Sequence, residues 1–111
     1  MPLIQADPQP ALSALATVEA AAVTLMGVAL QASADGDLET GEDLDIILRA
    51  AQCQDEQHYH LLTDAGGAPL TTTFTIAPDM LVDRTYLLIF LLELKAITMA
   101  GYMALARAWA E

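Results

Sequence analysis

Apolar residues recur every three or four positions between the proline-containing amino terminus and the polar sequence SADGD. This spacing predicts one face of a helix that begins at Pro10 or Ala11 and ends near Ser33. Glu19 lies in the middle of that face and is the only charged residue between positions 11 and 34. The complete face consists of Leu12, Leu15, Glu19, Ala22, Met26 and Ala29.

A second helix is expected from near Thr40 to the sequence AGG, in which Gly66 or Gly67 can adopt the left-handed conformation that ends many helices. Thr40 and Asp43 have the spacing of a capping box, with Asp in place of the usual Glu. One helical face is mostly apolar but also includes an acid and a histidine, Asp55 and His58. It consists of Leu44, Leu48, Ala51, Asp55, His58, Leu62 and Ala65.

The next segment, GAPLTTTFTIAP, alternates apolar residues with threonines, a pattern typical of an extended chain. Twelve extended residues span roughly 40 Å. A helix of about 24 residues is roughly 36 Å long. The segment is therefore long enough to cross the whole bundle, and we expect the second and third helices to run parallel.

A third helix, capped by Asp79 or Asp83, is expected to continue to the end of the chain. It is apolar almost all round, so we expect it to be buried on more than one side. Glu93 and Lys95 interrupt its apolar residues, which favours a buried helix over a membrane span of about 20 uncharged residues. These two side chains point to different sides of the helix. Glu93 has the more apolar neighbours and is the predicted inward residue.

Composition adds limits on fold and partners. The 111 residues suit one domain, with an arm at residues 1–10 and a helical domain at 11–111. A hydrophobic content of 55%, rich in Ala and Leu, favours an all-α fold. The formal charge of −11 argues against binding to nucleic acid or an anionic membrane and can attract cations. No signal peptide is evident, which favours a cytoplasmic location.

The acids on the predicted inner faces carry the candidate chemistry. A buried carboxylate is costly unless it is paired, protonated or bound to a metal. Each helix contributes one such acid, namely Glu19, Asp55 and Glu93, and His58 follows Asp55 by one turn. Carboxylates with an imidazole at this spacing suit Fe or Mn in a helical bundle. The alternative is structural, with each acid satisfied by a hydroxyl, a lysine or a nearby histidine.

Three segments resemble a known family: ATVEAAA around Glu19, DEQHYHLLTDAGGAPLTTTF, and LELKAITMAGYMALA. Over about residues 11–107, the chain is similar to the ferritin-like superfamily, and within it to the small bacterial ferritin-like domain proteins. The resemblance implies a four-helix bundle with a long crossover between the second and third helices. It also implies a carboxylate-bridged di-metal centre, built from one Glu on each of two helices and an ExxH on each of the other two.

By position, Glu19 matches the first-helix Glu of the family, and Asp55 with His58 matches the second-helix ExxH, with Asp in place of Glu. When the third helices are aligned on GYM, the family's acidic position falls on Lys95 and not on Glu93. That alignment puts an ammonium group where a cation should sit. No fourth helix with a second ExxH follows, so the resemblance implies a centre that is degenerate or completed by a partner.

Two functions follow as expectations. The first is a ferritin-like protein that binds Fe or Mn through Glu19, Asp55, His58 and Glu93, with or without catalysis. The second is a non-catalytic helical interaction or scaffold subunit that has lost the metal. Three helices leave an apolar groove where a fourth would pack. We therefore expect a homo-oligomer or a larger assembly through the third helix.

Overall fold

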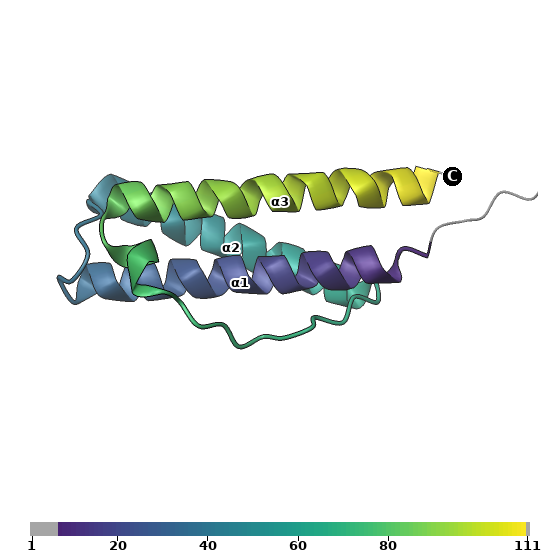
Figure 1. The fold of residues 1–111 in the computed structure, drawn as a ribbon, viewed down its shortest axis with the longest axis horizontal. Helices are drawn as coiled ribbons and strands as arrows, with labels where there is room; N and C mark the ends of the chain where they lie inside the picture. The colour runs from purple at the N-terminus through teal and green to yellow at the C-terminus, as the bar shows by residue number, and fades with distance from the viewer. Residues whose placement is uncertain (1–6, 111) are drawn as a thin grey trace, which may run out of the picture.

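The computed structural model of the chain describes residues 7–110, with side chains for residues 7–109. Three long helices form a bundle, α1 (Gln9–Ala34), α2 (Glu42–Asp64) and α3 (Arg84–Ala110), and a short 3₁₀ helix, η1 (Pro78–Leu81), precedes α3. No strand occurs among the described residues, which confirms the all-α prediction. Helix α1 packs against both α2 and α3 (Figure 1).

Helix α1 begins at Gln9, one residue before the predicted start, with Pro8 preceding it and Pro10 in its first turn. Of the predicted arm, residues 1–6 lie outside the described part of the chain. The predicted inner face of α1 is confirmed, because every one of its residues is buried: Leu12, Leu15, Glu19, Ala22, Met26 and Ala29. Their alternating spacing of three and four residues keeps them in one stripe along the helix.

The connection between α1 and α2 differs from the prediction. Helix α2 begins at Glu42 after Gly41, whose φ of 88° lies in the left-handed region. The buried hydroxyl of Thr40 does not cap α2; it hydrogen-bonds to Asp45 and to Ser33, with 2.8 Å between the two hydroxyl oxygens. The predicted capping box is wrong because this hydroxyl links the end of α1 to the start of α2.

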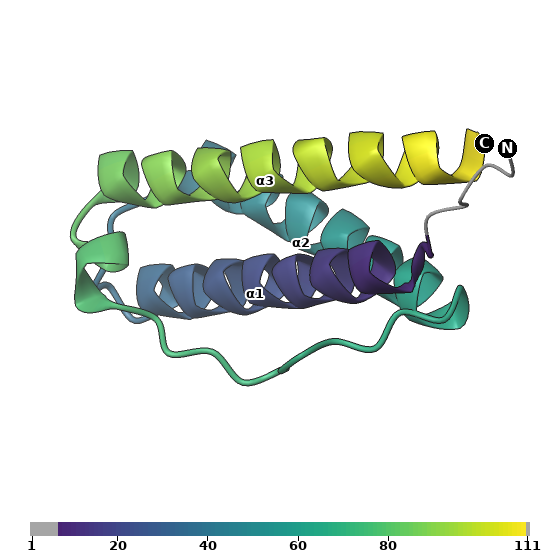
Figure 2. The same ribbon diagram turned by 45° about the vertical axis from the view of Figure 1, so that its right-hand side comes forward.

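The predicted crossover is confirmed. After α2, Gly66 takes the left-handed conformation with φ of 108°, and an extended segment then runs along α1 (Figure 2). Its amide groups donate hydrogen bonds to two hydroxyls one turn apart on α1. Ala68 N lies 3.0 Å from Ser13 Oγ, and Leu70 N lies 3.0 Å from Thr17 Oγ1. As a result α2 and α3 run in the same direction, and α1 runs against both (Figure 1).

Two features fix the start and the position of α3. Asp83 is its cap, since its Oδ1 accepts a hydrogen bond of 2.9 Å from the backbone N–H of Tyr86. Farther along, α3 approaches α1 closely at Gly101, where a Cβ atom would lie 2.6 Å from Leu15 Cδ2. The missing side chain therefore allows the carboxyl-terminal half of α3 to lie close to the buried face of α1.

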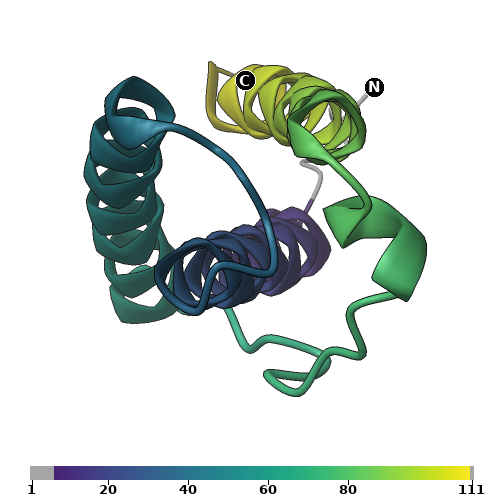
Figure 3. The same cartoon turned by 90° about the vertical axis from the view of Figure 1, so that its left-hand side faces the viewer.

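Helix α3 is far more exposed than predicted. Figure 3 shows α2 and α3 on different sides of α1, and α3 packs against α1 and the short helix η1. Its buried residues are Leu87, Leu91, Thr98 and Leu105. Its exposed large apolar residues are Tyr86, Ile89, Leu92, Ile97, Met99, Met103 and Trp109. The prediction of burial on more than one side is therefore wrong for a single copy of the chain.

Length and composition alone would allow α1 and α3 to cross a membrane. Only 17% of the apolar window of α3 is buried within the chain, compared with 39% for α1. Glu93 and Lys95 near the middle of α3 would be costly in a lipid interior.

Candidate metal centre

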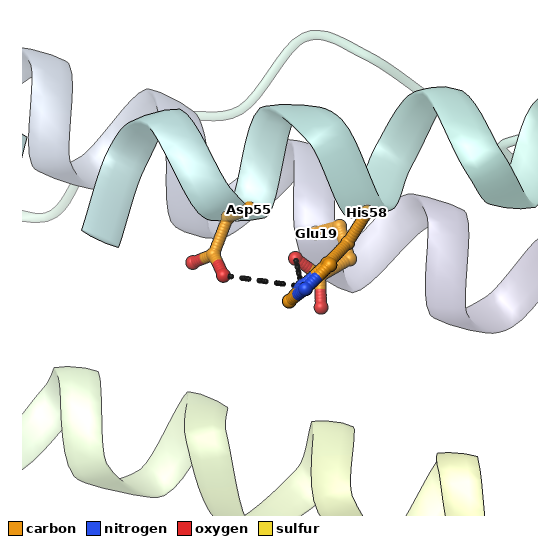
Figure 4. Close-up of side chains that lie close together, drawn as sticks. All are labelled: Glu19, Asp55 and His58. Atoms are coloured by element: carbon orange, nitrogen blue, oxygen red, sulfur yellow. Dashed lines mark ion pairs between the residues drawn. The ribbon is translucent and has the colours of Figure 1, made fainter. Parts of the chain in front are cut away.

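Glu19 of α1 and Asp55 and His58 of α2 converge, as the sequence predicts. Their side chains all point toward α3 (Figure 4). Each offers one oxygen or nitrogen atom, and these three atoms lie within 4.8 Å of one another. Both carboxylates are 1% exposed. The side chain of His58 is 46% exposed, so the group is buried on one side and open on the other.

The distances within this group leave one oxygen without a partner. His58 Nδ1 lies 3.7 Å from Glu19 Oε2 and 3.7 Å from Asp55 Oδ1. Both separations are too long for hydrogen bonds. Glu19 Oε2 is buried and has no hydrogen-bond partner. Because an unpaired buried carboxylate oxygen is costly, this site favours either a proton or a cation at Glu19.

The surroundings of Glu19 change its acidity. Burial, and then the nearby carboxylate of Asp55, raises the pKa of Glu19 from 4.5 to about 7, although the ammonium of Lys95 acts in the opposite direction. The hydroxyl of Tyr102 on α3 donates a hydrogen bond of 3.3 Å to Glu19 Oε1. Burial and the Glu19 carboxylate raise the pKa of Tyr102, so this phenol stays a donor.

Lys95, and not Glu93, is the charged residue of α3 that reaches the group. Lys95 Nζ lies 2.5 Å from both oxygens of Asp55. The side chain of Glu93 is exposed and lies outside the group. The prediction of Glu93 as the inward residue is therefore wrong. The apolar neighbours of Glu93 face a different side of the bundle, where Phe74 and Ile76 of the crossover lie.

Two residues of this site were not among its predicted members, Lys95 and Tyr102. One signal for Lys95 was present, because the alignment on GYM placed it at the acidic position of the third helix. Tyr102 follows Lys95 by seven residues and so lies on the same side of the helix. These two residues form the α3 side of the site.

Glu19, Asp55 and His58 form a group that could hold one metal ion. Two carboxylates and an imidazole are donors that Fe, Mn and Zn all accept. Ligand atoms around one such ion lie about 3.0–3.4 Å apart. The two separations of 3.7 Å from His58 Nδ1 would have to close by a few tenths of an ångström, and the three donor atoms as a set lie within 4.8 Å of one another. The described residues hold no second group of this kind, so they do not fit the di-metal centre implied by the family resemblance.

An apolar cavity of about 450 Å³ adjoins the site and is open to solvent. His58 and Tyr102 line it, together with Leu61, Leu105 and Trp109. It gives the exposed side of the site a path to solvent, as a metal site needs.

The pKa of Glu19 leads to a prediction for the metal-free protein. A folded pKa of about 7 against an unfolded value of 4.5 means that the folded state binds the proton more tightly. This contribution to the free energy of unfolding is complete below about pH 4.5 and is lost as the pH rises through about 7. We expect Glu19→Gln, which stays neutral, to be more stable than the wild type above pH 7 and to lose that advantage in acid.

Urea unfolding of both proteins in EDTA, at a series of pH values, measures this difference. Because both proteins share the other carboxylates, the difference between their free energies of unfolding isolates Glu19. A difference that does not change between pH 4.5 and pH 7 would contradict the prediction.

Comparison of the chain with known proteins found no match among protein-family models, curated proteins or solved structures.

Proposed function

We propose that this chain is a ferritin-like metal-binding protein whose centre takes one divalent ion, Fe²⁺ or Mn²⁺, between Glu19, Asp55 and His58. The observation that carries the proposal is the buried, unpartnered Glu19 Oε2, which lies 3.7 Å from the nitrogen of His58. A cation at this point would give that oxygen a partner and would offset the charge of two buried carboxylates. Tyr102, through its bond to Glu19 Oε1, would orient the carboxylate.

Metal content of the purified protein, and titration of the metal-free protein with Mn²⁺, test the proposal. We expect about one ion per wild-type chain. His58→Ala removes the only nitrogen donor of the group, and we expect it to weaken binding by about 10–100-fold or more. Because the chain carries a charge of −11, weak surface binding needs a matched control. His60→Ala removes an exposed histidine on the same helix and should bind like the wild type.

A wild-type chain that binds no more metal than the His58→Ala variant would overturn the proposal. Equal losses in the His58→Ala and His60→Ala variants would do the same, because they would indicate a general effect on the surface of α2.

The second candidate function is a helical interaction subunit that binds a second copy of itself through α3. A specific observation favours it. Five exposed residues of α3 repeat at alternating spacings of three and four: Ile89, Leu92, Ala96, Met99 and Met103. This is the apolar spacing of a helix that packs against another helix. A metal centre and this interface are compatible, because the stripe lies outside the group formed by Glu19, Asp55 and His58.

A further inference from the structure

The side chain of Lys95 binds Asp55, which is also a ligand of the proposed metal centre. It comes from α3, whereas Asp55 comes from α2, and its Nζ lies 2.5 Å from both carboxylate oxygens. These are the only hydrogen bonds between α2 and α3 within the described part of the chain. The ammonium thus supplies a positive charge next to two buried carboxylates.

The three side chains of the group differ in whether their ligand atoms already make a hydrogen bond. Asp55 Oδ1 accepts a hydrogen bond from Lys95 and is also the atom that lies 3.7 Å from His58 Nδ1. Glu19 Oε2 has no partner, and His58 Nδ1 makes no hydrogen bond in the group. A metal ion could therefore reach Glu19 and His58 without breaking a bond. It could reach Asp55 Oδ1 only by displacing or sharing the ammonium.

The charge and the exposure of Lys95 both favour its displacement from Asp55 by a metal ion. An ammonium group and a divalent cation a few ångströms apart repel each other strongly in a partly buried site. The side chain of Asp55 is 2% exposed and cannot move away without losing its packing, whereas the side chain of Lys95 is 42% exposed. A long side chain of this kind can turn its charged end into water at little cost.

From these contacts we infer that Lys95 is a built-in counter-ion that competes with the metal for Asp55 and leaves when the metal binds. This inference rests on the proposed metal centre, and it makes Lys95 the residue that sets the affinity of that centre. Without metal, Lys95 neutralises Asp55 and joins α3 to α2. With metal, the ion takes over the neutralisation, and the Lys95 side chain turns to solvent.

The first test compares Mn²⁺ affinity among variants, with free Mn²⁺ measured by electron paramagnetic resonance. We expect Lys95→Met to bind Mn²⁺ about tenfold more tightly than the wild type, since the competing charge is gone. Lys95→Arg retains the charge and should bind as the wild type does. Arg49→Met removes the same formal charge from an exposed position on α2, so it controls for the change in net charge.

The second test uses the wild-type chain and does not depend on a variant that folds. Lys95 is the only lysine in the sequence, so acylation of lysine by an amine reagent reports on this residue alone. We expect saturating Mn²⁺ to raise the acylation rate of Lys95 several-fold, as measured by mass spectrometry. The His58→Ala variant at the same Mn²⁺ concentration controls for any effect of Mn²⁺ on the reagent and should show a much smaller change.

The outcomes separate this inference from the proposed function. Suppose that the wild type binds Mn²⁺, but that Lys95→Met binds it no more tightly and Mn²⁺ does not raise the acylation rate of Lys95. The inference is then overturned and the metal centre stands. If only Lys95→Met binds Mn²⁺, the competition is supported and the proposal of a native metal protein is overturned. If neither the wild type nor Lys95→Met binds Mn²⁺, the inference and the proposed function are both overturned.

Discussion

Replacing Leu87 with alanine should lower the free energy of unfolding by about 2–5 kcal/mol. Leu87 is fully buried and belongs to the cluster formed with Leu25 and Met26 of α1. Few side chains of α3 are buried, so each of them contributes a large share of its attachment to α1. A loss of this size is a large fraction of the total stability of a small domain. Urea unfolding followed by circular dichroism measures it.

Leu92→Ala is the matched control, because Leu92 lies on the same helix but is 68% exposed. In a single chain, such a change should alter the free energy of unfolding by about 0.5 kcal/mol or less. A cost below about 1 kcal/mol for Leu87→Ala would contradict the packing of α3 on α1. A large cost for Leu92→Ala that depends on protein concentration would show that its face is covered in an assembly.

The second large effect concerns that assembly. We expect the wild-type chain to sediment as a dimer or a larger species, and the double variant Leu92→Glu, Met99→Glu to sediment as a monomer. Both residues lie in the exposed stripe of α3 and are 68% and 69% exposed in the single chain. Four carboxylates in a dimer interface would face one another in an apolar surface, which is strongly unfavourable. Sedimentation velocity at several protein concentrations measures the change.

Val82→Glu provides the control, since Val82 is 62% exposed but precedes α3 and lies outside the stripe. It should leave the assembly unchanged. Because each chain carries a charge of −11, added salt should strengthen the self-association by screening the repulsion between copies. A wild-type chain that remains a monomer at every concentration and salt level would exclude the interface between copies.

The α1 and α2 part of the site could be predicted from the sequence because these helices have a clear inner face. Glu19 is the only charged residue in a long apolar helix, so the spacing of its neighbours alone indicates that it is buried. Asp55 lies between Leu48 and Leu62 in the same way. The crossover could also be predicted, since the length of the extended segment is close to the length of a helix.

The α3 part could not be predicted by the same reasoning, because apolar residues occupy nearly all sides of that helix. Its outer stripe, which includes Leu92 and Met99, has the same spacing as a buried face. The choice between Glu93 and Lys95 therefore rested on small differences among their neighbours. Lys95 lies at the edge of the buried face, from which a long side chain can extend to Asp55. The spacing of apolar residues along a helix does not show how far a lysine side chain can extend from it.

The most direct test of the metal centre is anomalous diffraction from crystals of the wild-type protein grown with Mn²⁺. We predict one peak per chain within bonding distance of Glu19, Asp55 and His58, with the Lys95 side chain turned away from Asp55. A map with no peak at these residues, or with peaks only beside surface carboxylates, would contradict the proposed centre.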